Sequence, residues 1–205
     1  MANPTRQELR KLWRDATGEF DPNIPPDPEV DDLLQAGLER FNDVTEYHVT
    51  DDTTSVTFVD GTQEYTLPTD CLKLLWVKWN GKFLLPTDQE TLRNTQTGWN
   101  TRTGQPTHYY FNARSLGLFP TPDAGTVAAA ASPVLRYVST PAEVGATSAV
   151  ALLATQHRRI PVYWAAAEWY SGRGGNPAKN ATFLKLFEVA AGPAKAVYEA
   201  RNQLR

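Results

Sequence analysis

Apolar and polar residues alternate with helical spacing near the N-terminus, and this pattern predicts a first helix over residues 6–16. Thr5 and Glu8 form a capping box, in which two side chains satisfy backbone N–H groups at the helix start. Gly18 is typical of a helix end. The apolar positions of this helix fall on one face, and they are Leu9, Leu12, Trp13 and Ala16.

A second helix is predicted after a proline-rich connector, with Asp27 as its cap and Pro28 in its first turn. Its apolar face carries Val30, Leu33, Leu34, Gly37, Leu38 and Phe41. Its opposite, outer face carries Glu29, Asp31, Asp32, Glu39 and Asp43. A solvated surface is the simpler interpretation of these carboxylates. The sharper hypothesis is that Asp31, Asp32, Glu39 and Asp43 face a channel or a neighbouring subunit.

The middle of the chain has the short alternating runs of antiparallel β-structure. Asp60-Gly61 and Asn80-Gly81 indicate type I′ turns. Three hairpins are predicted, with strands over 55–59 and 62–67, 72–79 and 82–85, and 108–111 and 115–119. A last strand is predicted over 134–138. Thr87 and Glu90 indicate a second capping box and a short helix over 88–95.

The last third is again helical. One helix is predicted from Ile160-Pro161 to the glycine-rich break at 172–175, and a long helix from Pro177. Pro193 removes a helix hydrogen bond, so we expect the segment after it to leave the bundle and order only against a partner. Its expected contact residues are Tyr198, Arg201, Leu204 and Arg205. Deletion of 195–205 is then expected to leave a folded, soluble protein.

These elements predict an α+β fold: a helical bundle formed by the N- and C-terminal helices, with an inserted antiparallel β-rich subdomain. The expected boundaries are 1–50, 51–145 and 146–205 within one domain overall. The β-rich insertion is expected to make contacts between subunits, because long strand edges need cover.

Composition narrows the chemistry. The 205 residues contain one cysteine, Cys71, and three histidines in different predicted elements, His48, His108 and His157. Without converging groups we predict no catalytic, metal or cofactor-binding residues, and therefore no enzyme and no cofactor. No signal-peptide pattern or membrane span is expected. Residues 1–150 carry a formal charge of −8 and residues 151–205 one of +5. Solvated faces that happen to differ and head-to-tail contacts between copies explain this asymmetry equally well.

Aromatic residues offer one alternative function. The chain has 22 of them, and the β-rich part contains Trp76, Trp79, Tyr109, Tyr110 and Phe119. Core packing and cross-strand pairing are the simpler explanation. A stacking surface for carbohydrate or single-stranded nucleic acid stays open as an alternative.

The order of several short segments resembles a known family. They are Glu64–Asp70, the Asn80-Gly81 turn, Gly104–Tyr110, Leu116–Asp123, Arg136-Tyr137 and the helix start Ile160–Tyr163. Together they make residues 28–200 similar to the head-to-tail adaptor, or connector, proteins of tailed bacteriophages.

This resemblance implies a structural virion protein at the head–tail junction, assembled in the host cytoplasm. Such adaptors form a homo-oligomeric ring, of about twelve copies, below the portal. The ring extends the channel through which genomic DNA passes and offers a platform for tail proteins. No catalytic residue and no membrane contact come with the family. Another tail-completion or tail-tube subunit is the alternative within the virion.

Overall fold

The computed structural model describes residues 3–21, 23–129, 132–142, 150 and 153–203. Helices make up 45% and strands 22% of the chain, so the predicted α+β class is confirmed. The chain divides into two compact units. The helical unit comprises Met1–His48 and Thr140–Arg205, and the β unit comprises Val49–Ser139. The β unit spans residues 49–139, and the boundaries expected at 51 and 145 stay a prediction.

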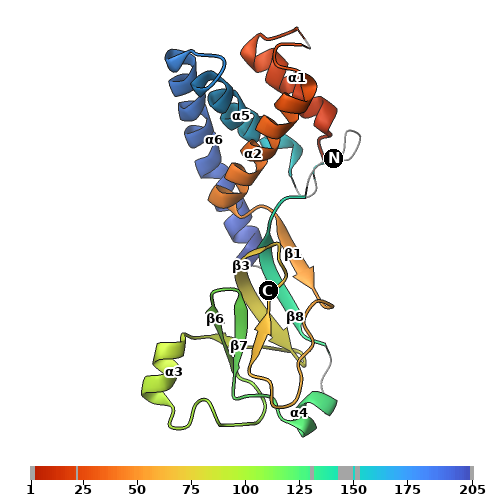
Figure 1. Cartoon of the computed structure of the whole chain (residues 1–205), viewed down its shortest axis with the longest axis vertical. Helices are drawn as coiled ribbons and strands as arrows, with labels where there is room; N and C mark the ends of the chain where they lie inside the picture. The colour runs from red at the N-terminus through yellow and green to blue at the C-terminus, as the bar shows by residue number, and fades with distance from the viewer. Residues whose placement is uncertain (1–2, 22, 130–131, 143–149, 151–152, 204–205) are drawn as a thin grey trace. The chain divides into compact units, whose positions relative to one another are not determined.

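Four long helices build the helical unit: α1 (Arg6–Thr17), α2 (Asp27–Thr45), α5 (Arg159–Ser171) and α6 (Pro177–Gln203) (Figure 1). A short 3₁₀ turn, η1 (Thr155–His157), precedes α5. All four helices contribute to one apolar core, because each has a stripe of apolar side chains. Its largest fully buried side chains are Trp13, Phe41, Tyr47, Leu9, Leu38 and Leu153.

Local capping signals fix the start of α1 as predicted. The Thr5 hydroxyl accepts from Glu8 N–H and the Glu8 carboxylate accepts from Thr5 N–H at 2.7 Å, so the capping box is confirmed. Helix α2 starts differently. Pro26 is its N-cap, without a side-chain bond, and the predicted Asp27 cap is wrong. The Asp27 carboxylate instead accepts from Arg10 and Arg14 on α1.

Helices α2 and α5 approach each other closely at Gly37. A Cβ atom on Gly37 would lie 2.3 Å from the backbone oxygen of Pro161. Ala165 and Ala166 on α5 are fully buried. Small residues on both helices therefore set the distance between the two backbones.

Two four-stranded sheets build the β unit (Figure 1). The first sheet has the order β1 (Val49–Asp52), β8 (Val134–Ser139), β3 (Cys71–Trp79), β4 (Lys82–Phe83). The second has the order β2 (Glu64–Thr66), β7 (Ser115–Phe119), β6 (His108–Asn112), β5 (Leu85–Pro86). Two short helices, α3 (Gln89–Thr95) and α4 (Ala124–Ala129), complete the unit. One apolar cluster draws side chains from both sheets, among them Val77, Trp79, Leu116, Leu118 and Leu135.

Three local predictions for the β unit were wrong. A turn exists at Asp60-Gly61, but it is not the predicted type I′ turn, because Gly61 adopts a positive φ of 70° and Asp60 does not. Residues 55–59 form no strand, and β2 pairs with β7 instead. The strand expected over 82–85 is divided, since β4 pairs with β3 whereas β5 pairs with β6. The cap of α3 is Asp88, whose carboxylate accepts from Thr91 N–H at 2.7 Å, and not the expected Thr87. In each case a longer-range contact or a better-placed side chain replaced the local signal.

Candidate assembly surfaces

The outer face of α2 presents three exposed carboxylates, Asp32, Glu39 and Asp43, which we call the acidic stripe. They occur seven and four residues apart, so they share one face of the helix. Glu39 accepts a hydrogen bond from the Gln35 amide at 3.1 Å. Within the part of the chain that the structure describes, no cationic side chain forms an ion pair with these three residues. Their role at a channel or subunit contact stays a prediction.

Asp31 does not belong to this exposed surface, and its predicted place on the outer face was wrong. It is 7% exposed, and its carboxylate accepts from the Arg10 guanidinium, at 2.5 Å from Arg10 Nε, and lies 3.3 Å from Arg6 Nε. One residue along a helix rotates the side chain by about 100°, which turns Asp31 toward α1 and Asp32 toward solvent. This hydrogen bond also raises the pKa of Arg10. Asp31 therefore joins α1 to α2.

The C-terminal part of α6 also lies differently from the prediction. The helix is continuous through Pro193, and Tyr198 is 3% exposed within the core of the helical unit. The Tyr198 ring lies 6.0 Å from that of Phe41, and its hydroxyl accepts from Ala154 N–H at 3.2 Å and bonds His157 Nδ1 at 3.1 Å. Burial lowers the pKa of His157.

The turn of α6 that follows Tyr198 also bonds to the unit, through the two residues that follow α2. The Arg201 guanidinium donates to the carbonyl oxygen of Tyr47, and Asn202 Nδ2 donates to that of Glu46 at 2.9 Å. The expectation that this segment stands free of the bundle was therefore wrong. Leu204 and Arg205 lie outside the described residues. Docking of a portal through Tyr198, Arg201, Leu204 and Arg205 stays a prediction.

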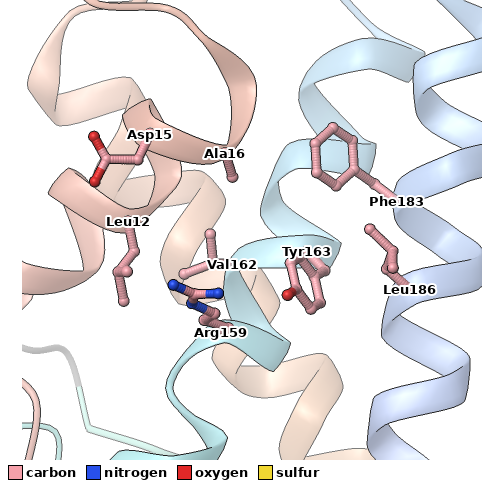
Figure 2. A pocket seen from close by; sticks show the side chains of 8 residues that line it. All are labelled: Leu12, Asp15, Ala16, Arg159, Val162, Tyr163, Phe183 and Leu186. Atoms are coloured by element: carbon pink, nitrogen blue, oxygen red, sulfur yellow. The ribbon is translucent and has the colours of Figure 1, made fainter.

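A groove of about 310 Å³ lies between α1 and α6 over α5 (Figure 2). Its lining is mostly apolar, and only Asp15 and Arg159 carry charge. The other lining residues are Leu12, Ala16, Val162, Tyr163, Phe183 and Leu186. The groove holds no nucleophile with an adjacent base, so its lining favours contact with apolar groups over catalysis.

One surface was missed from the sequence, on the first sheet of the β unit. Arg136 on β8 lies opposite Trp76 on β3, and Lys78 on β3 lies opposite Phe83 on β4. The Arg136 guanidinium carbon lies 5.8 Å from the Trp76 ring centroid, and Lys78 Nζ lies 5.4 Å from that of Phe83. We call these four residues the cation–aromatic platform. The four residues come from three strands that are separate in the sequence. The sequence pattern could therefore have revealed only that Trp76 and Lys78 share one face of β3.

The platform residues lie on the outer face of that sheet. Their neighbours in the strands, Val77, Leu135 and Trp79, point into the apolar cluster, and successive strand side chains alternate between faces. The rings of Trp76 and Phe83 meet edge to face, with centroids 5.1 Å apart. Asp51 on β1 shares this face, since it is opposite Arg136 and 3.6 Å from its Nε.

The histidines and the cysteine singled out from the sequence lie in separate elements. The described residues contain no group of three or more His, Cys, Asp or Glu side chains placed to hold a metal ion. His48 follows α2, His108 begins β6 and His157 lies in η1, where it bonds Tyr198. Cys71 is half-buried, and burial raises the pKa of its thiol to about 11. Among the described residues, no helix combines the length and apolar character of a membrane span.

Comparison with protein families matched the family described as SU10 adaptor protein over residues 5–205. Comparison with curated protein sequences gave no match. The family match includes the whole of residues 28–200, for which the sequence resembles phage connectors, and the resemblance is confirmed. The chain belongs to the SU10 adaptor protein family, a family of phage head-to-tail adaptors.

Proposed function

We propose that this protein forms a homo-oligomeric ring of about twelve copies between the portal and the tail of a phage particle. The single observation that carries this proposal is the family match over residues 5–205. In this role the protein is a structural component at the head–tail junction. Each copy contributes a segment of wall to the DNA channel and a platform for tail proteins.

Charge supports a passive, sliding role toward DNA. The chain has a formal net charge of −3, and residues 1–150 carry −8. A protein that grips DNA neutralises many phosphates with lysine and arginine. Carboxylates near a channel repel phosphates, so DNA passes without being held.

Assembly on the portal tests the proposal directly. The chain is purified alone and mixed with purified portal rings, and particle masses are measured by mass photometry and imaged by electron microscopy. We expect a monomer alone and a closed ring of copies on the portal. If the chain neither forms rings nor binds the portal, the proposed function is wrong. Attachment to isolated tails without portal binding would instead indicate a tail-completion subunit.

A further inference from the structure

We propose that the cation–aromatic platform of one copy binds the acidic stripe on α2 of the neighbouring copy. This inference rests on the proposed ring and names the two surfaces through which its copies meet. The two surfaces differ, so the contact is heterologous, and repeated rotation through such contacts closes a ring. The platform comprises Trp76, Lys78, Phe83 and Arg136, and the stripe comprises Asp32, Glu39 and Asp43.

The two cations of the platform are held in place before a partner arrives. Each lies over an aromatic ring, at 5.4 Å for Lys78 and 5.8 Å for Arg136, and the two rings are packed edge to face. The Arg136 side chain is only 20% exposed. Long side chains lose rotamer freedom when they bind, and a cation that is already positioned loses less. The platform is therefore prepared to bind carboxylates.

The spacing of the two surfaces matches. Lys78 and Arg136 occupy diagonal positions on adjacent strands, which places the two residues about 7–8 Å apart, with their Cβ atoms somewhat closer. Glu39 and Asp43 are one helical turn apart, with about 5–6 Å between their Cβ atoms. The flexible lysine and glutamate side chains span the difference. Asp32 lies about 10 Å further along the same helix face, toward the N-terminus of α2.

Charge is complementary as well. The stripe carries three carboxylates, and within the described chain no cation pairs with them. On the platform face, Asp51 is 55% exposed and pairs with Arg136, so this carboxylate does not offset the positive charge of Lys78. Tryptophan and arginine are the residue types that contribute most at protein interfaces. A second copy supplies the acidic surface that such a face requires.

Nucleic acid fits the platform less well than a second copy. Stacking of a base needs an open ring face, whereas each platform ring already has a cation over it. Phosphate binding needs several cations in a row, and here Asp51 opposes one of the two. The platform therefore favours a few fixed carboxylates over a nucleic-acid strand.

Charge reversal on each surface, alone and combined, tests the pairing. One variant carries Lys78→Glu, a second carries Glu39→Lys, and a third carries both changes, so that Arg136 and Asp43 keep their charges. Ring formation on the portal is followed by mass photometry at low salt. Each of the first two variants should assemble about tenfold or more weakly, because like charges then meet. The third should recover assembly to within about threefold of the unmodified chain.

Matched controls keep the result specific. Arg114→Glu, on an exposed turn of the β unit, and Glu188→Lys, exposed on α6, make the same changes of charge elsewhere. Both should assemble like the unmodified chain. Circular dichroism shows whether Lys78→Glu folds. If Lys78→Glu does not fold, the Glu39→Lys variant still tests the pairing, because Glu39 is exposed on α2.

Disulfide trapping gives a second measurement. A chain with Glu39→Cys and Lys78→Cys, in a Cys71→Ser background, should form a ladder of linked copies on oxidation, and neither cysteine alone should do so. Assembly of both half-reversed variants at the normal level, or a combined variant that does not recover, overturns the pairing while the ring stands. The pairing is also overturned if Lys78→Glu binds DNA more weakly than the unmodified chain but assembles at the normal level. An unmodified chain that forms no ring overturns the proposed function and this inference together.

Discussion

Substitution of Gly37 by alanine tests whether close contact between α2 and α5 determines the stability of the helical unit. A Cβ atom at Gly37 would lie 2.3 Å from Pro161 O and 3.1 Å from Pro161 C. Real Cβ contacts essentially never fall below 3.0 Å, so α5 must move by about 0.7 Å, the difference between 2.3 and 3.0 Å. Both contacted atoms belong to the backbone, so no side-chain rotation relieves the overlap.

The expected magnitude follows from two opposing effects. Overpacking against a rigid neighbour costs about 3 kcal/mol, at the upper end of measured insertions. Alanine gains about 1 kcal/mol over glycine in a helix interior. We therefore expect Gly37→Ala to lower the free energy of unfolding by about 2 kcal/mol.

Urea unfolding, followed by circular dichroism at 222 nm, measures this change. Gly125→Ala is the matched control. It adds the same methyl group at an exposed position of α4, where the nearest atom, Asp123 Oδ1, would lie 3.7 Å from the new Cβ. This control should be neutral or stabilising by up to about 1 kcal/mol. If Gly37→Ala is as stable as the unmodified chain, backbone contact between α2 and α5 does not limit stability, and the reasoning is refuted.

Three further predictions follow from single side chains. Gly117→Ala should destabilise the β unit by about 3 kcal/mol or more in urea, because the new Cβ would lie 2.0 Å from the Tyr110 ring; an unchanged unfolding midpoint would contradict this. Asp31→Asn should cost about 2 kcal/mol in the same assay by removing the buried carboxylate that pairs with Arg10, which keeps only Asp27 as an acidic partner, whereas Asp32→Asn should change stability by less than about 0.5 kcal/mol. The rate of Cys71 alkylation in the folded protein should keep rising up to about pH 11, because burial raises the pKa of the thiol from an ordinary 9.0 to about 11. The folded protein therefore loses stability as the pH rises from 9 to 11. A rate plateau near pH 9 would be inconsistent with a half-buried thiol.

Signals that act within a few residues were predicted well from the sequence. The capping box needs only Thr5 and Glu8, and both reciprocal hydrogen bonds are present. The Asn80-Gly81 turn needs two residues that accept positive φ, and they adopt 48° and 76°. The pairing of β6 with β7 follows from a turn of two residues. In these places the local preference and the fold agree.

Pairings between distant segments were not predicted. The Asp60-Gly61 turn forms, yet β2 pairs with β7, about fifty residues further along the chain, and Phe58 is buried without a strand partner in the β unit. The candidate assembly surfaces were also predicted incompletely, because they depend on the positions of distant segments. Asp31 and Asp32 are adjacent in sequence, and only the position of α1 decides that one is buried and the other exposed. The cation–aromatic platform requires the register of β3, β4 and β8, which no single segment contains.

The structure reverses the expected result of deleting residues 195–205. This truncation removes Tyr198, which packs against Phe41 and Tyr47 in the core of the helical unit. It also removes the bond from Asn202 to the Glu46 carbonyl oxygen, which helps to satisfy the end of α2.

Loss of a buried aromatic side chain alone costs about 3–5 kcal/mol, against a total stability of about 5–15 kcal/mol for a typical domain. We expect the truncated protein to unfold at a much lower urea concentration, or not to fold. Loss of portal attachment in that protein would therefore say nothing about docking. Val197 lies on the same helix and is 52% exposed, so Val197→Lys changes the surface and leaves the core intact. Normal stability with lost attachment would identify α6 as a docking surface, and normal attachment would exclude the exposed face around Val197.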